Sequence, residues 1–368
     1  MIVNDEQQQF FMLQAIRLGE EGRISAPPNP WVGCLIVNRG EIVGKGYHTT
    51  IGSPHAEVIA LQQAGPLARG ATAFVSLEPC AHWGRTPPCA QALIESGIAQ
   101  VVIPCLDPDP QVSGKGVEIL KQAGIQVVVG IAQKQALSSL EPYLYNRRTQ
   151  LPFCVVKLAM SIDGRIASAD GSSKWITGEE SRRDVQLLRA SSQAILIGAQ
   201  TALADQPRLT VRDFTLPKQP LRVLIDGKGR ALPPAPLFDA CLGSTLIFTT
   251  DRCDPKRISQ WKECNSEVII APSIEGHVDL FFVLKELGKR KVVQLLVEGG
   301  SEMAGAFLNK NLVNRLIVYM GNCLLGHEGK PIFSSLSPLP VEQAPRWDLK
   351  SVYRFEDDIR LDYLIKNI

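Results

Sequence analysis

Strand and helix patterns alternate along this chain in two successive series, and this alternation limits the possible folds more than any other feature. The first series ends near residue 130. A polar helical stretch at 133–150 separates it from a second series that begins at Phe153. Strands that alternate with helices form sheets covered by helices, and 368 residues are enough for two domains of ordinary size. We therefore predict two α/β domains, at 1–149 and 150–368.

Hydrophobic periodicity and turn residues set the bounds of the predicted elements. Asp5 is the expected N-cap of the opening helix, and Asn38-Arg39-Gly40 is the expected turn of a hairpin. In the first domain we predict strands 31–37, 41–46, 71–77, 100–104 and 125–129 and helices 6–19, 55–63, 89–96 and 116–123. In the second we predict strands 153–159, 194–197, 221–225, 245–248, 268–270, 292–297 and 316–319, helices 179–190, 279–287 and 301–309, and a closing hairpin of 347–355 and 359–365.

Composition and charge exclude several classes of protein. The 39 basic and 37 acidic residues leave a net charge of +2, whereas nucleic-acid-binding proteins usually carry a clustered basic surplus. No apolar run reaches the roughly 18 residues of a membrane span, and residues 1–11 lack the pattern of a signal peptide. The nine cysteines are scattered, which favours a reducing cytosol over a disulfide framework. We expect a cytoplasmic protein that binds neither nucleic acid nor membranes.

The first domain contains a set of residues typical of a catalytic zinc site. His55 begins a His-Ala-Glu triplet that ends at Glu57, and Cys80 and Cys89 follow, each at the start of a predicted helix. One imidazole and two thiolates would fill three tetrahedral positions of Zn²⁺ and leave the fourth for water. Zinc lowers the pKa of such a water, and a nearby carboxylate must then carry its proton. Glu57 is the candidate for that role.

Two features of this pattern leave alternatives open. Zinc deaminases commonly carry H-x-E followed by P-C-x-x-C, whereas here eight residues, 81–88, separate the two cysteines. Positions two apart lie about 200° apart on a helix, so His55 and Glu57 share a site only if the helix is just beginning there. A structural zinc with His82 as its fourth ligand is the alternative. His48 and His277 are interpreted as ordinary surface or core histidines.

The second domain is less informative by itself. It lacks the G-x-G-x-x-G pattern, so a Rossmann fold is not indicated. In the stretch 292–306, a strand leads through Glu298 and two glycines into a helix, which suits a bound phosphate but is also common as plain packing. Arg189 and Arg212 suit a substrate phosphate or surface ion pairs. Lys157 could contact substrate or end a sheet edge, and Trp175 could stack on a ring or fill a core.

Several longer stretches match a known family. The segment EPCAHWGRTPPC, at 78–89, is the most specific of them. Through these stretches the chain resembles, over nearly its whole length, the bifunctional deaminase–reductase family of riboflavin biosynthesis. The loop between the cysteines fits this family better than the nucleoside or tRNA deaminases. The other matching stretches are NPWVG at 29–33, PHAEV at 54–58, DPDPQV at 107–112, KLAMSIDGR at 157–165, WIT at 175–177, RDVQLLRA at 183–190, AD at 204–205 and LTVR at 209–212.

The resemblance implies a cytidine-deaminase-like α/β/α sandwich followed by a dihydrofolate-reductase-like α/β domain. It implies that His55, Cys80 and Cys89 hold Zn²⁺ and that Glu57 carries the proton. The first reaction would remove the amino group at C2 of a diaminopyrimidinone that bears a phosphoribosylamino group. The second would reduce the ribosyl chain to ribityl with NADPH, which delivers hydride directly and needs no protein nucleophile. We expect a homo-oligomer that acts on this small phosphoribosylaminopyrimidine.

The resemblance also implies contacts to ligands in both domains. It places NADP contacts at Ala159, Trp175, Thr201, Asp205, Gly227, Gly300, Ser301, Glu302, Met303, Ala304, Gly305 and Ala306. It places substrate contacts at Asn29, Ser173, Arg189, Leu209, Arg212 and Glu298.

Two other classes of function compete with this interpretation. A nucleic-acid-editing deaminase would need a basic channel with interleaved aromatic residues, and the near-neutral charge and 6% aromatic content count against it. A zinc-stabilised binding module without turnover would need four protein ligands and would tolerate changes at Glu57.

Overall fold

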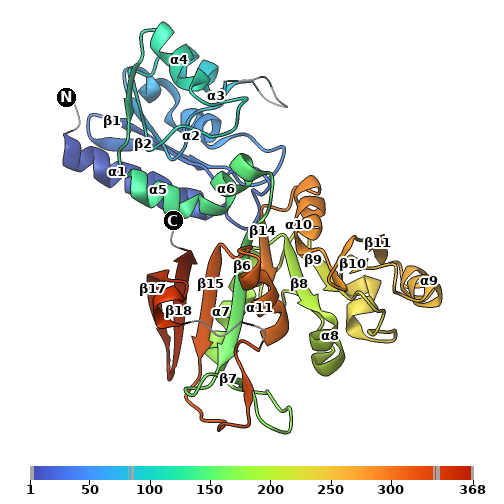
Figure 1. The fold of residues 1–368 in the computed structure, drawn as a ribbon. Coiled ribbons are helices and arrows are strands. Elements are labelled where there is room, and N and C mark those ends of the chain that lie inside the picture. The colour runs from blue at the N-terminus through green and yellow to red at the C-terminus, as the bar shows by residue number, and fades with distance from the viewer. Residues whose placement is uncertain (1–3, 82, 84–86, 335, 337–339, 366–368) are drawn as a thin grey trace. The chain divides into compact units, whose positions relative to one another are not determined.

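A computed structural model describes residues 4–81, 83, 87–334, 336 and 340–365. The chain divides into two compact units, Met1–Gln150 and Leu151–Ile368 (Figure 1). No helix in the described part of the chain is both long and apolar enough to cross a membrane.

A five-stranded mixed sheet forms the centre of the first unit, with the order β2-β1-β3-β4-β5 among the described residues. β1 pairs antiparallel with β2 and β3, whereas β3, β4 and β5 run parallel. The β1–β2 turn contains Arg39 and Gly40, both at positive φ, as a two-residue hairpin requires. The strands are β1 (Gly33–Asn38), β2 (Glu41–Tyr47), β3 (Thr72–Val75), β4 (Gln100–Ile103) and β5 (Gln126–Val129).

Alternate residues of β1 enter two separate cores, which makes this unit a three-layer sandwich. Cys34 and Ile36 belong to one core, together with apolar residues of α2, α3 and α4. Leu35 and Val37 point to the other face, where α1 and α5 cover the sheet. The helices are α1 (Asp5–Glu20), α2 (Ala56–Ala64), α3 (Cys89–Glu95), α4 (Lys115–Gln122), α5 (Gln133–Ser139) and α6 (Glu141–Thr149).

The second unit contains a nine-stranded sheet among its described residues, in the order β11-β10-β9-β8-β14-β6-β15-β18-β17. The strands from β11 to β15 in this order run parallel, and β18 and β17 add an antiparallel hairpin. The strands are β6 (Phe153–Met160), β8 (Ala194–Gly198), β9 (Leu221–Ile225), β10 (Thr245–Thr249), β11 (Glu267–Ile270), β14 (Gln294–Val297), β15 (Arg315–Met320), β17 (Trp347–Phe355) and β18 (Asp358–Ile365).

Helices cover both faces of this sheet. Leu316 and Val318 of β15 pack into the core that apolar residues of α10 and α11 complete. Tyr319 points to the opposite face, where its hydroxyl donates to Asp184 of α7. The helices are α7 (Glu179–Ala190), α8 (Ala199–Asp205), α9 (Pro255–Glu263), α10 (Leu280–Lys289) and α11 (Ser301–Asn309). Two short strand pairs, β7 (Arg165–Ala167) with β16 (Lys330–Pro331) and β12 (Ser273–Ile274) with β13 (His277–Val278), lie outside the main sheet.

The structure corrects some predicted bounds. Asn4, rather than Asp5, caps α1, because its side chain accepts from the N–H of Gln7 in a capping box. The stretch 133–150 forms two helices, α5 and α6, in place of one. α8 and α9 were not predicted from the sequence.

Phe307 of α11 is fully buried in the larger core, and we expect its truncation to destabilise the second unit. Phe307→Ala should lower the free energy of unfolding by about 3–5 kcal/mol, because it removes a large apolar side chain and leaves a cavity. Urea unfolding measures this change. Phe281→Ala, at a side chain of α10 that is 44% exposed, is the control and should cost far less. Equal losses for the two variants would contradict this assignment of the core.

Candidate functional sites

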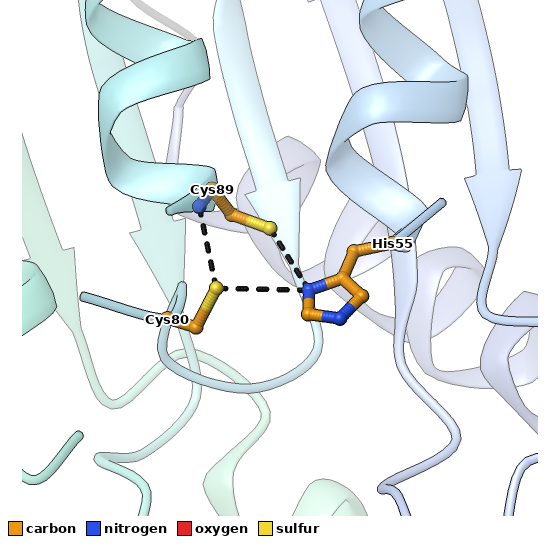
Figure 2. A group of neighbouring side chains, drawn as sticks. All are labelled: His55, Cys80 and Cys89. Carbon is orange, nitrogen blue, oxygen red and sulfur yellow. Dashed lines mark hydrogen bonds between the residues drawn. The ribbon is translucent and has the colours of Figure 1, made fainter. Parts of the chain in front are cut away.

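His55, Cys80 and Cys89 meet in the first unit although they lie up to 34 residues apart in the sequence (Figure 2). His55 is the N-cap residue of α2, Cys80 lies in the segment after β3, and Cys89 is the first residue of α3. Their potential ligand atoms all lie within 4.8 Å of one another. Among the residues that the structure describes, this is the one such cluster of three or more histidine, cysteine or acidic side chains.

The spacing of these three side chains fits a tetrahedral metal ion. The Nδ1 atom of His55 lies 3.1 Å from the Cys89 sulfur and 3.6 Å from the Cys80 sulfur. Ligands on a tetrahedral zinc, with Zn–N and Zn–S bonds of about 2.0 and 2.3 Å, are separated by roughly 3.5 Å. The donor set, one imidazole and two thiols, is also one that Zn²⁺ prefers. His82, the alternative fourth ligand, lies outside the described residues.

The cluster favours a thiolate even without a metal. Hydrogen bonds from the Cys89 thiol and from His55, together with the Cys89 backbone N–H, lower the pKa of Cys80 to about 4. The contact with Cys80 in turn raises the pKa of His55 above its ordinary value. The prediction that Cys80 begins a helix was wrong, because it lies in an irregular segment. Its negative charge is stabilised by the start of α3 at Cys89 instead.

Glu57 points into the same cluster. His55 has an extended backbone (φ −73°, ψ 163°) because it is the N-cap residue and precedes the first turn of α2. The helical rotation that would separate the side chains of His55 and Glu57 has therefore not yet begun. Glu57 is 4% exposed, and burial raises the pKa of its carboxyl group to about 7. Its carboxylate also hydrogen-bonds to the Cys89 side chain. A buried carboxyl with a pKa near neutrality, in contact with a potential metal ligand, is suited to accept and donate protons.

His48 belongs to this site, although no local pattern in the sequence distinguishes it from an ordinary histidine. It is buried, its ring lies 5.2 Å from the ring of His55, and its Nε2 hydrogen-bonds to the side chain of Asn29 at 3.1 Å. Burial lowers the pKa of His48. The expected substrate contact Asn29 is thereby held beside the cluster. His48 directly follows β2, whereas Asn29 lies in the loop before β1, so their contact is tertiary and no local pattern reveals it.

Glu78 is a second residue that sequence reasoning did not single out. Its buried carboxylate accepts hydrogen bonds from the backbone N–H groups of Asp107, Gly114, Gly116 and Val117, at 3.0 to 3.3 Å. It therefore ties the segment that leads to Cys80 to the loop after β4 and to the start of α4. Buried N–H groups need such acceptors. The only signal in the sequence was an acidic residue directly before Pro-Cys.

In the second unit, Arg189 and Glu298 form a largely buried bidentate ion pair, with side chains that are 13% and 10% exposed. The Nε and Nη2 atoms of Arg189 each donate to one carboxylate oxygen at 2.7 Å, and its Nη1 donates to the Thr210 carbonyl. Burial alone would raise the pKa of Glu298, but the charge of Arg189 outweighs it and holds that pKa below its ordinary value. Burial lowers the pKa of Lys157, which lies near both groups. This pair unites two of the six residues expected to contact substrate.

The expected NADP contacts of the second unit gather at one edge of its sheet. β9, β8, β14 and β6 are parallel neighbours, so their carboxyl ends lie together. Ligands of open α/β sheets bind at that edge. Ala159 lies at this end of β6, Gly227 follows β9, Glu298 follows β14, and α8, with Thr201 and Asp205, follows β8. Gly300 caps α11, whose first turns hold Ser301, Glu302, Met303, Ala304, Gly305 and Ala306.

Hydrogen bonds, burial and exposure describe the surroundings of the other residues expected to contact NADP or substrate. The Gly300 N–H donates to the Thr201 hydroxyl at 3.2 Å, which joins α8 to α11. The backbone N–H of Arg212 donates to Gln186 of α7, and the Arg212 charge acts on Glu298. Leu209 is buried at positive φ. Ser173 precedes the 68% exposed Trp175, so the alternative that this tryptophan fills a core is wrong.

Comparison with known proteins gives the families of the two units. Residues 5–105 match the family described as the cytidine and deoxycytidylate deaminase zinc-binding region, and residues 152–361 match the RibD C-terminal domain. The riboflavin biosynthesis protein RibD of Chlamydia pneumoniae is 45% identical over 349 residues, which cover 94% of this chain and 92% of that protein.

Two solved structures share the fold over nearly the whole chain. RibD of Acinetobacter baumannii, form 1, matches with a TM-score of 0.88 and 38% identity, covering 99% of this chain and 100% of that one. A diaminohydroxyphosphoribosylaminopyrimidine deaminase/5-amino-6-(5-phosphoribosylamino)uracil reductase from Thermotoga maritima matches with a TM-score of 0.87 and 32% identity, covering 98% and 99%.

The fold and the histidine–cysteine cluster define an enzyme in which a zinc-type deaminase unit is joined to a reductase unit. The chain belongs to the RibD family, the bifunctional deaminase–reductases of riboflavin biosynthesis. The resemblance found in the sequence is thus confirmed, as is the mixed α/β fold. The same matches support Zn²⁺ and NADPH as the cofactors.

The raised pKa of Glu57 predicts a pH-dependent stability of the metal-free protein. A folded-state pKa of about 7, against 4.5 for the ordinary group, means that the folded protein favours the neutral acid and loses stability as the pH rises through this interval. Glu57→Gln should therefore be more stable than the parent at pH 8, by on the order of 2–3 kcal/mol, and similar to it at pH 4.

Urea unfolding of the zinc-free proteins at the two pH values measures this difference. Glu95→Gln, an exposed position on α3, is the control and should show no pH-dependent gain. A stability gap between Glu57→Gln and the parent that is equal at both pH values would contradict the assigned pKa.

Proposed function

We propose that residues 1–149 deaminate 2,5-diamino-6-(5-phosphoribosylamino)pyrimidin-4-one. Residues 150–368 would then reduce the product to 5-amino-6-(5-phosphoribitylamino)uracil. The observation that carries this proposal is the meeting of His55, Cys80, Cys89 and buried Glu57 in one site of a chain that also carries the reductase unit. The name of the Thermotoga maritima relative describes the same two reactions.

In the deaminase, His55, Cys80 and Cys89 would hold Zn²⁺, and Glu57 would carry protons. When bound there, zinc supplies Lewis acidity that turns water into a nucleophile at neutral pH. Glu57 accepts the proton that this water loses and delivers it to the amino group that leaves as ammonia. Burial raises the pKa of this carboxyl group in the metal-free protein, which favours a group that exchanges protons near neutral pH. Asn29, held by His48, would bind the pyrimidine.

In the reductase, NADPH would supply the hydride, and reduction at C1 of the open-chain imine form of the ribosylamine would also add one proton to the imine nitrogen. The residues at the carboxyl edge of the sheet would orient cofactor and sugar. Ala159, Trp175, Thr201, Asp205, Gly227 and the residues from Gly300 to Ala306 would contact NADPH, and Ser173, Arg189, Leu209, Arg212 and Glu298 the substrate. The Arg189–Glu298 pair supports this assignment, because it holds both side chains rigidly where the strands end.

The setting of the enzyme is part of the same proposal. The near-neutral net charge favours an enzyme that binds no nucleic acid. The scattered cysteines favour the cytoplasm, and the proposal includes a homo-oligomer.

A coupled assay of the whole chain with Glu57→Gln tests the two activities together. The parent should release ammonia and oxidise NADPH when given the diaminopyrimidine. The variant should bind one zinc per chain, release ammonia at least about 100-fold more slowly, and still oxidise NADPH when given the deaminated substrate. Undiminished ammonia release would refute the role of Glu57, and no NADPH oxidation by the parent would refute the reductase assignment.

Arg212→Ala tests the binding of the substrate phosphate. Loss of a guanidinium–phosphate contact should raise the substrate KM of the reductase by about tenfold or more, because hydrogen bonds to charged groups contribute about 1.5–3 kcal/mol. The KM for NADPH should change little. Arg183→Ala, at an exposed arginine of α7 paired with Glu179, is the control. Equal changes in both KM values would contradict the assignment.

A further inference from the structure

The N-terminus of α7 lacks a cap of its own. Its N-cap residue is Gly178, which has no side chain to accept from the first N–H groups of the helix. Ser181, at the third helical position, is fully buried and does not reach back to Gly178 in the way that a Glu or Gln does in a capping box. Gly178, Glu179 and Glu180 are exposed, so water reaches the first N–H groups of the helix, whereas the buried hydroxyl of Ser181 needs a protein acceptor.

Asp358, the first residue of β18, supplies the missing acceptor from 180 residues away. Its Oδ2 atom accepts from the Gly178 backbone N–H at 2.7 Å and from the Ser181 hydroxyl at 2.6 Å. The side chain is 4% exposed, so water cannot replace these bonds readily. A carboxylate also suits the positive end of the helix dipole.

The same face of β18 makes the next contacts with α7. Arg360, two residues further along, donates to Asp184 of α7 at 2.7 Å and to both oxygens of Asp362. The Tyr319 hydroxyl donates to the same Asp184. Because residues 358, 360 and 362 alternate along one strand, they present one polar face to the helix. The hairpin thus fixes both the start and the middle of α7.

The first turn of α7 in turn holds the segment around Trp175. Arg182, next to Ser181, donates to the Thr177 carbonyl at 2.5 Å, and its guanidinium lies 4.6 Å from the centre of the Trp175 ring. The Trp175 side chain is otherwise mostly exposed. A shift of the helix start would therefore move Arg182 and release the tryptophan.

We propose that Asp358 is a positioning residue for the reductase: it fixes the start of α7 and thereby the Trp175 segment that binds NADPH. The inference rests on the proposed role of Trp175 as a cofactor contact. Asp358 itself is not among the residues assigned to contact substrate or cofactor.

Hydrogen exchange tests the structural link without relying on any activity. In Asp358→Ala, the amides of Gly178 and Arg182, which are hydrogen-bonded at the start of α7, should exchange faster, by about tenfold or more, because a buried acceptor is lost. Amides of the central strands should keep their protection. Asp358→Asn should behave like the parent, because both bonds reach a single oxygen that the amide retains. Asp357→Ala, at the exposed neighbouring position, is the matched control.

Kinetics of the whole chain tests the consequence. Asp358→Ala should raise the KM for NADPH by about five- to tenfold, with kcat at saturating NADPH nearly unchanged and deamination unaffected. Ser181→Ala removes one of the two bonds and should give a smaller rise, and it serves as the second variant if Asp358→Ala does not fold. In Arg182→Leu the stacking contact is already lost, so adding Asp358→Ala should raise the KM less than it does in the parent.

Each result bears on the inference in a defined way. Unchanged exchange at Gly178 and Arg182 in both Asp358→Ala and Ser181→Ala would overturn it. A loss of rate at every NADPH concentration with an unaltered KM would also overturn it, since that pattern reports only a smaller folded fraction. No NADPH oxidation by the parent would refute the proposed function, and the exchange experiment alone would then decide the positioning role.

Discussion

Parallel strand pairing brings the carboxyl ends of neighbouring strands to one edge of a sheet, and both candidate sites depend on this geometry. In the first unit β3 and β4 pair in parallel, so the segment with Glu78 and Cys80 emerges beside the loop that contains Asp107. In the second unit β8, β14 and β6 pair in the same sense, so Thr201, Glu298 and Ala159 reach a common edge. The sheets thus create the sites, and the helices that follow the strands supply their N-termini and side chains.

Buried charged groups then make each site rigid. Glu78 accepts four backbone N–H groups, Arg189 and Glu298 satisfy each other with two parallel bonds, and Arg360 lies between two carboxylates. Burying a charge costs free energy that its partner only partly offsets. Such groups therefore specify a geometry more than they add stability, and removal of one partner leaves the other charge buried and unpaired. This is the physical reason why single substitutions at these positions should act on ligand binding as well as on folding.

Local patterns were sufficient for much of the fold and for the cluster of candidate zinc ligands. The helix at 179–190 and the strand at 347–355 were predicted with the observed bounds, because amphipathic periodicity and turn residues are properties of a short window. The cluster of His55, Cys80 and Cys89 was predictable because ligand types and spacing reflect metal chemistry. The roles of His48, Glu78 and Asp358 were not, since each depends on a partner that only the tertiary structure brings near. A buried acidic residue and an exposed one look alike in a sequence.

The cap that Asp358 gives to α7 also sets an order of events during synthesis. The ribosome makes about 5–20 residues per second, so Gly178 is made about 10–35 seconds before the carboxylate that will accept from it, 180 residues later. Throughout this interval the Gly178 N–H must hydrogen-bond to water or to another acceptor. The candidate zinc ligands of the first unit, by contrast, lie at most 34 residues apart and are complete before α7 is translated. The candidate metal site can therefore form early on the nascent chain. The second unit can be completed only after β18 has been synthesised.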